Sequence, residues 1–211
     1  MKTSKDYRAA ARESLNGHWK QAAIMALVFS AIGGLLSGPF VLIDNEKATA
    51  GASSLVSFLI IAPISVGVIM AILKFIRTQD DNFIGNAFNE AFSDYLHKVL
   101  TIFIMTIFVL LWTLLFFIPG IIMGYAYRLT PYLLKDNPEL SELDTIRLSK
   151  NMMKGHKWEL FVLQLSFIGW ILLSLLSLGI GLLWVIPYMQ VAEAHFYEDV
   201  KAEYELKATI A

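Results

Sequence analysis

The chain has 211 residues, of which 56% are hydrophobic and 17% charged, and its formal net charge is −1. Its apolar content is higher and its charged content lower than in an average soluble domain, so the composition predicts an integral membrane protein with the lipid bilayer as its surroundings. The near-neutral charge offers no basic stripe for phosphates, which excludes nucleic acid as an expected partner. The sequence lacks cysteine, which excludes disulfides, thiolate nucleophiles and cysteine-ligated metals.

The N-terminus predicts a short surface helix followed by a membrane span. Thr3 and Asp6 have the spacing of a capping box, and Gly17 is expected to end the helix. His18 then leads into the apolar stretch 22–43, which has 22 residues. This stretch is longer than the ~7–15 apolar residues of a cleavable signal, so we expect it to stay as the first span.

The next two segments predict a second span and an amphipathic helix. Residues 55–73 are apolar and form the second predicted span. Residues 82–98 carry apolar side chains in pairs every four positions, which places them on one stripe of a helix. We expect this helix to end at His97 and Lys98. Its polar face is acidic, so packing against neighbouring spans is favoured over attraction to anionic lipid.

Residues 99–127 hold no Asp, Glu, Lys, Arg or His and allow two interpretations. They form one long tilted helix, or they turn back at Pro119 and Gly120, a dipeptide typical of turns. A turn at this point gives a third span over 99–118 and a shorter fourth span over 121–134.

The distribution of positive charge favours the turn. With it, five of the 17 Lys and Arg residues lie in 1–21, three in 74–98, six in 128–157 and two beyond Glu193, all on one side, and only Lys47 lies on the other. Positive residues concentrate on the cytoplasmic side of membrane proteins. The sequence therefore predicts a multi-pass plasma-membrane protein with both termini cytoplasmic, whereas a five-span model would export six positive charges.

The segment 160–192 has 33 residues and contains no Asp, Glu, Lys, Arg or His. A helix of this length would measure ~50 Å, too long for one crossing of a ~30 Å hydrocarbon core. We expect the chain to reverse at Gly179 and Gly181, because glycine accepts the positive φ angles of a tight turn. The fifth and sixth spans are then 160–178 and 182–197.

The segment before the fifth span repeats the pattern of the N-terminus. At a constant offset of 138 residues, Thr3, Asp6, Gly17 and His18 align with Ser141, Asp144, Gly155 and His156. Each even-numbered span also holds one proline, namely Pro63, Pro131 and Pro187. The sequence therefore predicts an all-α polytopic membrane bundle in a single domain over 1–211. Its six transmembrane helices form three hairpins, with a cytoplasmic amphipathic helix before each odd-numbered span.

Several motifs carry a family resemblance. They are Ser149-x-x-Met152-Met153-Lys154-Gly155-His156-Lys157-Trp158, Leu165-Ser166-Phe167-Ile168-Gly169-Trp170, Gly179-Ile180-Gly181, Pro187-Tyr188, Ile118-Pro119-Gly120-Ile121 and Tyr132-Leu133-Leu134-Lys135-Asp136-Asn137-Pro138. Together they resemble a bacterial family of multi-pass membrane proteins of unknown function (DUF class), and the likeness covers nearly the whole chain. The resemblance implies a bacterial plasma-membrane location, and it implies no activity and no catalytic residues.

Three histidines are candidates for a cluster at the cytoplasmic interface. His18, His97 and His156 each precede an odd-numbered span and would meet if the three units packed around an axis, where they would bind a metal or handle protons. We favour the alternative that they are amphipathic residues at the headgroup level. Since no zinc-helix, phosphate-loop or nucleophile-elbow motif occurs, no catalytic residue, metal or cofactor is predicted.

Arg128 and Glu193 are the candidate intramembrane charge pair. Arg128 lies eight residues after Gly120 and Glu193 twelve after Gly181. At the helical rise these positions are ~12 Å and ~18 Å deep, inside the hydrocarbon region. Neither residue has an oppositely charged neighbour on its own helix, which predicts that they pair with each other. The alternative is that Arg128 reaches the cytoplasmic surface and Glu193 marks the end of a short sixth span.

Three functions remain open from the sequence. Spans one, two, three and five contain no ionisable group of the kind that ion-coupled transporters and intramembrane hydrolases need near mid-membrane. We therefore favour a non-enzymatic membrane protein that acts through lipids or other membrane proteins. The alternatives are a passive or lipid-handling transporter with a cavity between the hairpins, and an enzyme. No feature of the sequence identifies an oligomeric state.

Overall fold

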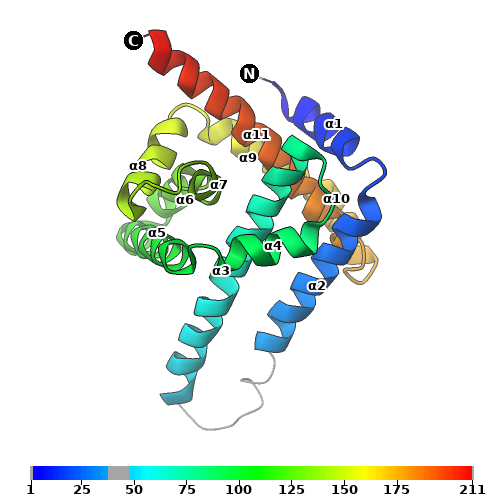
Figure 1. Ribbon diagram of the computed structural model, residues 1–211, viewed down its shortest axis with the longest axis horizontal. Helices are drawn as coiled ribbons and strands as arrows, with labels where there is room; N and C mark the ends of the chain where they lie inside the picture. Colours follow the sequence, from blue (N-terminus) through cyan, green and yellow to red (C-terminus); the bar gives the residue numbers. More distant parts are fainter. Residues whose placement is uncertain (1, 38–47, 211) are drawn as a thin grey trace.

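The computed structural model describes residues 2–37 and 48–210, which form eleven α-helices and no β-strand (Figure 1). The predicted all-α class is confirmed. In chain order the helices are α1 Ser4–Ser14, α2 Trp19–Ser37, α3 Ala48–Thr78, α4 Phe83–Phe92, α5 Tyr95–Leu115, α6 Phe117–Ala126, α7 Thr130–Asp136, α8 Glu142–Met152, α9 Lys157–Leu165, α10 Ile168–Leu176 and α11 Leu182–Ile210.

Three stretches of the described chain are long and apolar enough to cross a membrane. They are Phe58–Thr78 in α3, Tyr95–Leu115 in α5 and Lys157–Leu176 across α9 and α10. The apolar part of α2, Trp19–Leu35, is shorter, and the rest of the predicted span 22–43 lies outside the described residues. Length and composition thus support three of the six predicted spans.

The fourth and sixth predicted spans differ from the expectation. Residues 121–134 do not form one helix, because α6 ends at Ala126 and α7 begins at Thr130. Pro131 therefore lies in the first turn of α7, where its missing N–H breaks no helical hydrogen bond. The sixth predicted span is part of α11, which continues beyond it to Ile210 and carries charged side chains over its second half.

The helices that correspond to the predicted spans run in different directions (Figure 1). Figure 1 shows α2 and α3 from the side, at similar slopes, whereas α5 is seen almost along its axis. The α4 helix lies between α2 and α3 and contacts both of them. The α5–α6 and α10–α11 pairs do pack together, as expected of neighbours joined by short turns. Both chain ends lie at one end of the molecule, where α1 packs on α11.

The core surrounds α11. Phe196 and Tyr197 on this helix are completely buried. The ring of Tyr197 stacks on Tyr132 with centroids 4.8 Å apart, and Phe196 meets Tyr7 edge to face at 5.5 Å. Aromatic pairs of this kind bury large apolar areas in fixed geometries. They hold the surface helix α1 and the short helix α7 against opposite sides of α11.

The amphipathic segment ends earlier than predicted. The α4 helix stops at Phe92, and Asp94 adopts a left-handed conformation with φ 45° before α5 begins at Tyr95. The Lys98 ammonium donates to the carbonyl of Ser93 at 2.7 Å and to that of Glu90, both at the end of α4. His97 and Lys98 thus belong to the first turns of α5, because the lysine satisfies the free carbonyls of the preceding helix from there.

The predicted caps are present at both surface helices. Thr3 and Asp6 form a reciprocal capping box at α1, and the Ser141 hydroxyl accepts from the backbone N–H of Asp144 at α8. Gly17 and Gly155 have φ values of 87° and 90°, each three residues after its helix ends. Both helices have 11 residues and their ends keep the offset of 138. The local pattern read from the sequence is therefore confirmed at these ends.

Of the two predicted reversals, one is confirmed and one is displaced. The chain turns between α10 and α11 around Gly179, which has φ 84°. The other reversal lies at Phe116, with extended φ −157°, and not at Pro119 and Gly120, which are in the first turn of α6. Proline suits a first helical turn, so the dipeptide begins the returning helix and does not form the turn itself.

Candidate functional site

The predicted contact between Arg128 and Glu193 is present in the structure. Arg128 lies in the turn between α6 and α7, and Glu193 lies near the middle of α11. The guanidinium donates to Oε2 of Glu193 from Nη2 at 2.9 Å and from Nε at 3.2 Å. Arg128 does not turn away from its partner, because a buried carboxylate without a counter-charge would cost several kcal/mol.

Two further polar side chains extend this pair. Gln164 on α9 donates from Nε2 to Oε1 of Glu193 at 2.7 Å, and it accepts from the Tyr125 hydroxyl at 2.8 Å. Both carboxylate oxygens of Glu193 are therefore bonded. Sequence analysis missed Gln164, although it is the only amide side chain in residues 160–178. A lone amide in an apolar span is the signal that could have identified it.

A groove of about 370 Å³ lies beside the pair. Its lining comes from α5, α6, the turn after α6, and α9, and consists of Val109, Thr113, Gly120, Ile121, Gly124, Tyr125, Arg128 and Gln164. The two partners of the ion pair face different environments, because the Arg128 side chain is 45% exposed and that of Glu193 only 4%. The pair is thus a dipole whose positive end borders the groove and whose negative end is buried.

The hairpin between α5 and α6 sets the shape of this groove. A Cβ atom on Gly120 would lie 2.2 Å from Oγ1 and 2.7 Å from Cα of Thr113, so only glycine permits the two helices to approach this closely. A Cβ on Gly124, one turn further along α6, would meet no atom within 4 Å. Gly120 therefore allows α5 and α6 to pack in direct contact. The missing side chain at Gly124 leaves the space that forms the groove.

The three histidines each have an acidic partner of their own. Nδ1 of His18 lies 3.2 Å from Asp81, and Nδ1 of His97 lies 3.3 Å from Glu142. Nδ1 of His156 lies 3.1 Å from Glu159. Across residues 2–37 and 48–210, no three His, Asp or Glu side chains are arranged to hold a metal ion. Each of the three histidines thus contacts a different carboxylate.

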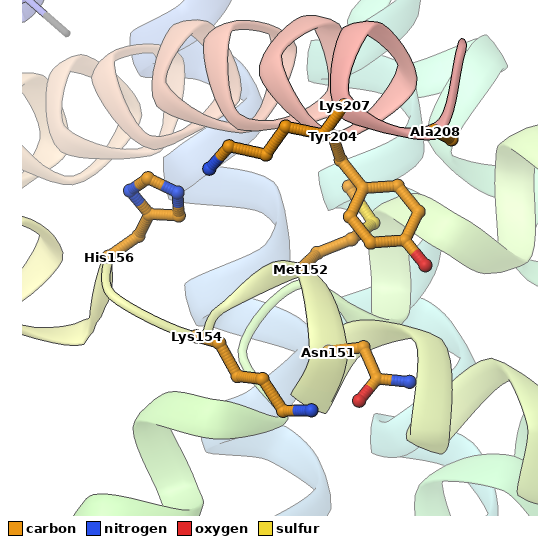
Figure 2. Close-up of a pocket in the computed structure, with 7 residues that line it drawn as sticks. All are labelled: Asn151, Met152, Lys154, His156, Tyr204, Lys207 and Ala208. Atoms are coloured by element: carbon orange, nitrogen blue, oxygen red, sulfur yellow. The ribbon is translucent and has the colours of Figure 1, made fainter. Parts of the chain in front are cut away.

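His156 lines a second hollow, of about 330 Å³, between the end of α8 and the C-terminal part of α11 (Figure 2). In Figure 2 the Lys207 side chain extends along this hollow toward the imidazole. Glu203 Oε1 lies 2.6 Å from the Lys207 ammonium and 3.6 Å from Nε2 of His156. The same carboxylate therefore contacts both Lys207 and His156 at this hollow.

Comparisons with known proteins give one family and no individual relative. No curated protein and no solved structure matches the chain. The model of a family described as protein of unknown function (DUF975) matches residues 1–122 and again residues 114–204. The two matches together extend over nearly the whole chain, in agreement with the resemblance carried by the sequence motifs. The chain therefore belongs to the DUF975 family, a family of unknown function.

Proposed function

We propose that this chain is an integral membrane protein without catalytic activity, whose function is to bind an amphiphile with an anionic headgroup in the groove beside Arg128. The observation that carries the proposal is the orientation of the ion pair. Glu193 is buried and bonded at both oxygens, whereas the Arg128 side chain is 45% exposed and belongs to the lining of the groove. A guanidinium in this position offers donors to a phosphate or carboxylate, and the apolar wall from Ile121 and Val109 accommodates a hydrocarbon tail.

The exposed surface supports a membrane location. Leu114 and Leu176 are each 83% exposed, and Leu178 is 94% exposed. Large apolar side chains of α5 and α10 are exposed in continuous rows that would be unfavourable in water and are favourable in hydrocarbon. The positive charges predict that both termini are cytoplasmic. A reporter that is active only outside the cytoplasm should give signal when fused at residue 46 and none at 80, 140 or 211.

The polar chemistry supports binding over catalysis. Glu193 accepts hydrogen bonds from Arg128 on one oxygen and from Gln164 on the other. Both of its oxygens are thus engaged by side chains of the protein itself, which leaves neither directed at a substrate. The cluster therefore serves to hold Arg128 in one orientation at the groove.

The test is the amphiphile that co-purifies with the protein. Gly124→Leu fills the groove without altering a charge, and Arg128→Gln removes the cation. Gly34→Leu is the matched control, because a Cβ on Gly34 of α2 also meets no atom within 4 Å. We expect mass spectrometry of the purified protein to show loss of the bound anionic amphiphile in the first two variants and retention in the control. Retention in Gly124→Leu at wild-type level would refute the proposal.

A passive lipid transporter is the second candidate. It is favoured by the polar side chains of Thr113, Tyr125 and Gln164 along the same groove, which would solvate a headgroup as it moves. Lipid exchange between the leaflets of proteoliposomes distinguishes the two functions. A transporter accelerates this exchange and is inhibited by Gly124→Leu, whereas a protein that only binds leaves the exchange rate unchanged.

A further inference from the structure

Arg8 is a charged residue that does not line the groove beside Arg128. It projects from α1 toward the junction of α9 and α10, where Nη1 donates to the carbonyl of Ser166 at 3.0 Å. Its Nε is buried and has no hydrogen-bond partner among the described residues. Within the described part of the chain, no carboxylate lies within ion-pair distance of this guanidinium. Arg8 therefore keeps a positive charge that the protein itself does not neutralise.

Arg8 lies at one end of a groove of about 530 Å³. The remaining lining consists of Gly169, Trp170, Leu172, Leu173 and Leu176 from α10, and of Ser166, which follows the last residue of α9. The lining contains no acidic residue, and its floor is formed at Gly169, where a Cβ would meet no atom within 4 Å. The groove thus combines one uncompensated cation with an apolar wall.

The apolar wall is long enough to contact one acyl chain. The α10 helix has nine residues, which at the helical rise correspond to ~13 Å. An acyl chain fills half of a ~30 Å hydrocarbon core, which is a similar length. Arg8 is placed at the end of the wall next to the surface helix α1.

We infer that this groove binds a glycerophospholipid with an anionic headgroup, with its phosphate at Arg8 and one acyl chain along α10. The inference rests on the membrane location proposed above and not on the groove beside Arg128. The charge decides the occupant, because the uncompensated Arg8 attracts an anion, whereas a free phosphate would leave the apolar wall from Trp170 to Leu176 without a partner. Arg128 differs in having Glu193 as a permanent counter-ion.

The surface helix keeps its position without Arg8. Tyr7 is buried against Phe196, and the Tyr188 hydroxyl donates to the backbone carbonyl of Arg8 at 2.9 Å. Arg8→Gln removes neither contact. Arg12→Gln is the matched control, because it removes the same charge from the same helix at an exposed position outside the groove.

The test is native mass spectrometry of the full chain in nanodiscs that contain equal amounts of phosphatidylglycerol and phosphatidylcholine. We expect the wild type to retain phosphatidylglycerol preferentially, and Arg8→Gln to lower this preference about fivefold, the factor that one interfacial cation contributes. Arg12→Gln should change the preference by less than half as much. An equal loss in both variants would mean general attraction to the membrane surface and would overturn the inference.

Two further measurements separate this site from its alternatives. Gly169→Leu should remove the lipid preference that depends on Arg8. Gly124→Leu should leave this preference unchanged, although it loses the amphiphile bound beside Arg128, so the two grooves can be tested independently. The melting temperature of each variant verifies that it is folded. Glycerol 3-phosphate, the soluble headgroup, should not displace the lipid at millimolar concentration. Complete displacement would identify the site as one for free phosphate, and unchanged retention in Gly169→Leu would likewise refute a lipid in this groove.

Discussion

Arg77 donates two parallel hydrogen bonds to Asp136, from Nη1 to Oδ1 at 2.6 Å and from Nη2 to Oδ2 at 2.8 Å. The same carboxylate accepts from the Lys201 ammonium at 2.6 Å and from the Tyr197 hydroxyl at 2.7 Å. Its side chain is only 6% exposed. One buried carboxylate thus joins α3, α7 and α11, which carry these four residues at widely separated positions in the sequence.

Removal of this carboxylate should destabilise the fold. Asp136→Ala leaves Arg77 and Lys201 without their shared partner, and the loss of one member of a buried ion pair costs about 3–5 kcal/mol. Asp199→Ala is the control, because its partner Lys2 is largely exposed and such surface pairs contribute about 0–1 kcal/mol. Thermal unfolding in detergent measures both changes. Equal melting temperatures for the two variants would contradict a central role for Asp136.

The same residue predicts a loss of stability in acid. Burial raises the pKa of Asp136, but the hydrogen bonds from Arg77, Lys201 and Tyr197 lower it by more, so this pKa lies well below its usual range. A carboxyl with a lowered folded-state pKa contributes stability that is complete above its unfolded pKa of ~4 and is lost as the pH falls through its folded pKa. The melting temperature of the wild type should therefore fall below pH ~4 more steeply than that of Asp136→Asn. Parallel curves would exclude this contribution.

A charge swap tests the energetic coupling between Arg128 and Glu193. Arg128→Glu and Glu193→Arg each place two like charges in a low-dielectric site and should each cost about 3–5 kcal/mol. The double variant restores opposite charges and should recover at least half of the summed loss, as measured by yield and melting temperature. Gln164→Leu, which removes only the amide, should cost less than either single swap. Additive losses in the double variant would show that the contact contributes no coupling energy.

Glycine at position 120 should be required for packing of α6 on α5. Gly120→Ala places a methyl group against the backbone of Thr113 at 2.7 Å, and overpacking of this kind costs about 1–3 kcal/mol. Gly124→Ala, on the same helix, adds a methyl group in open space and should leave the melting temperature within about 1 °C of wild type. If both variants melt at the same temperature, the close approach of the helices does not depend on Gly120.

The left-handed conformation at Gly155 gives a separate prediction. Its φ of 90° is unfavourable for any residue with a Cβ and most of all for a β-branched one. Gly155→Val should therefore destabilise the protein by about 1–2 kcal/mol. Gly155→Asn should cost less, because asparagine tolerates positive φ better than other residues. Equal losses for valine and asparagine would point to lost space around Gly155 and not to its backbone conformation.

Structural features that depend only on neighbouring residues agree best with the predictions from the sequence. The capping box at Thr3, the cap at Ser141 and the glycines that end the two surface helices were all predicted and are present. Each depends on interactions within about five residues, so the local sequence contains all the participants. The reversal at Gly179 follows from the same local logic together with the length of the apolar stretch.

The predicted ends of helices were wrong where a residue could belong to either of two consecutive segments. Pro119 and Gly120 suit a turn and a first helical turn equally well, and the structure uses them for the second. Lys98 was expected to end the amphipathic helix, but from α5 it satisfies the carbonyls at the end of α4. Such outcomes depend on how two helices pack, which the sequence of either helix does not specify.

The helical class, the caps and the two charges without a partner in their own helix turn could be predicted from residue types and their spacing. Three contacts became visible only once the helices were packed: Gln164 completes the bonding of Glu193, Asp136 joins three helices, and Arg8 faces an apolar wall without a counter-ion. The physical reason is that an apolar stripe or an unpaired charge specifies that a partner is needed, whereas the partner's identity depends on the packing of helices that are distant in the sequence.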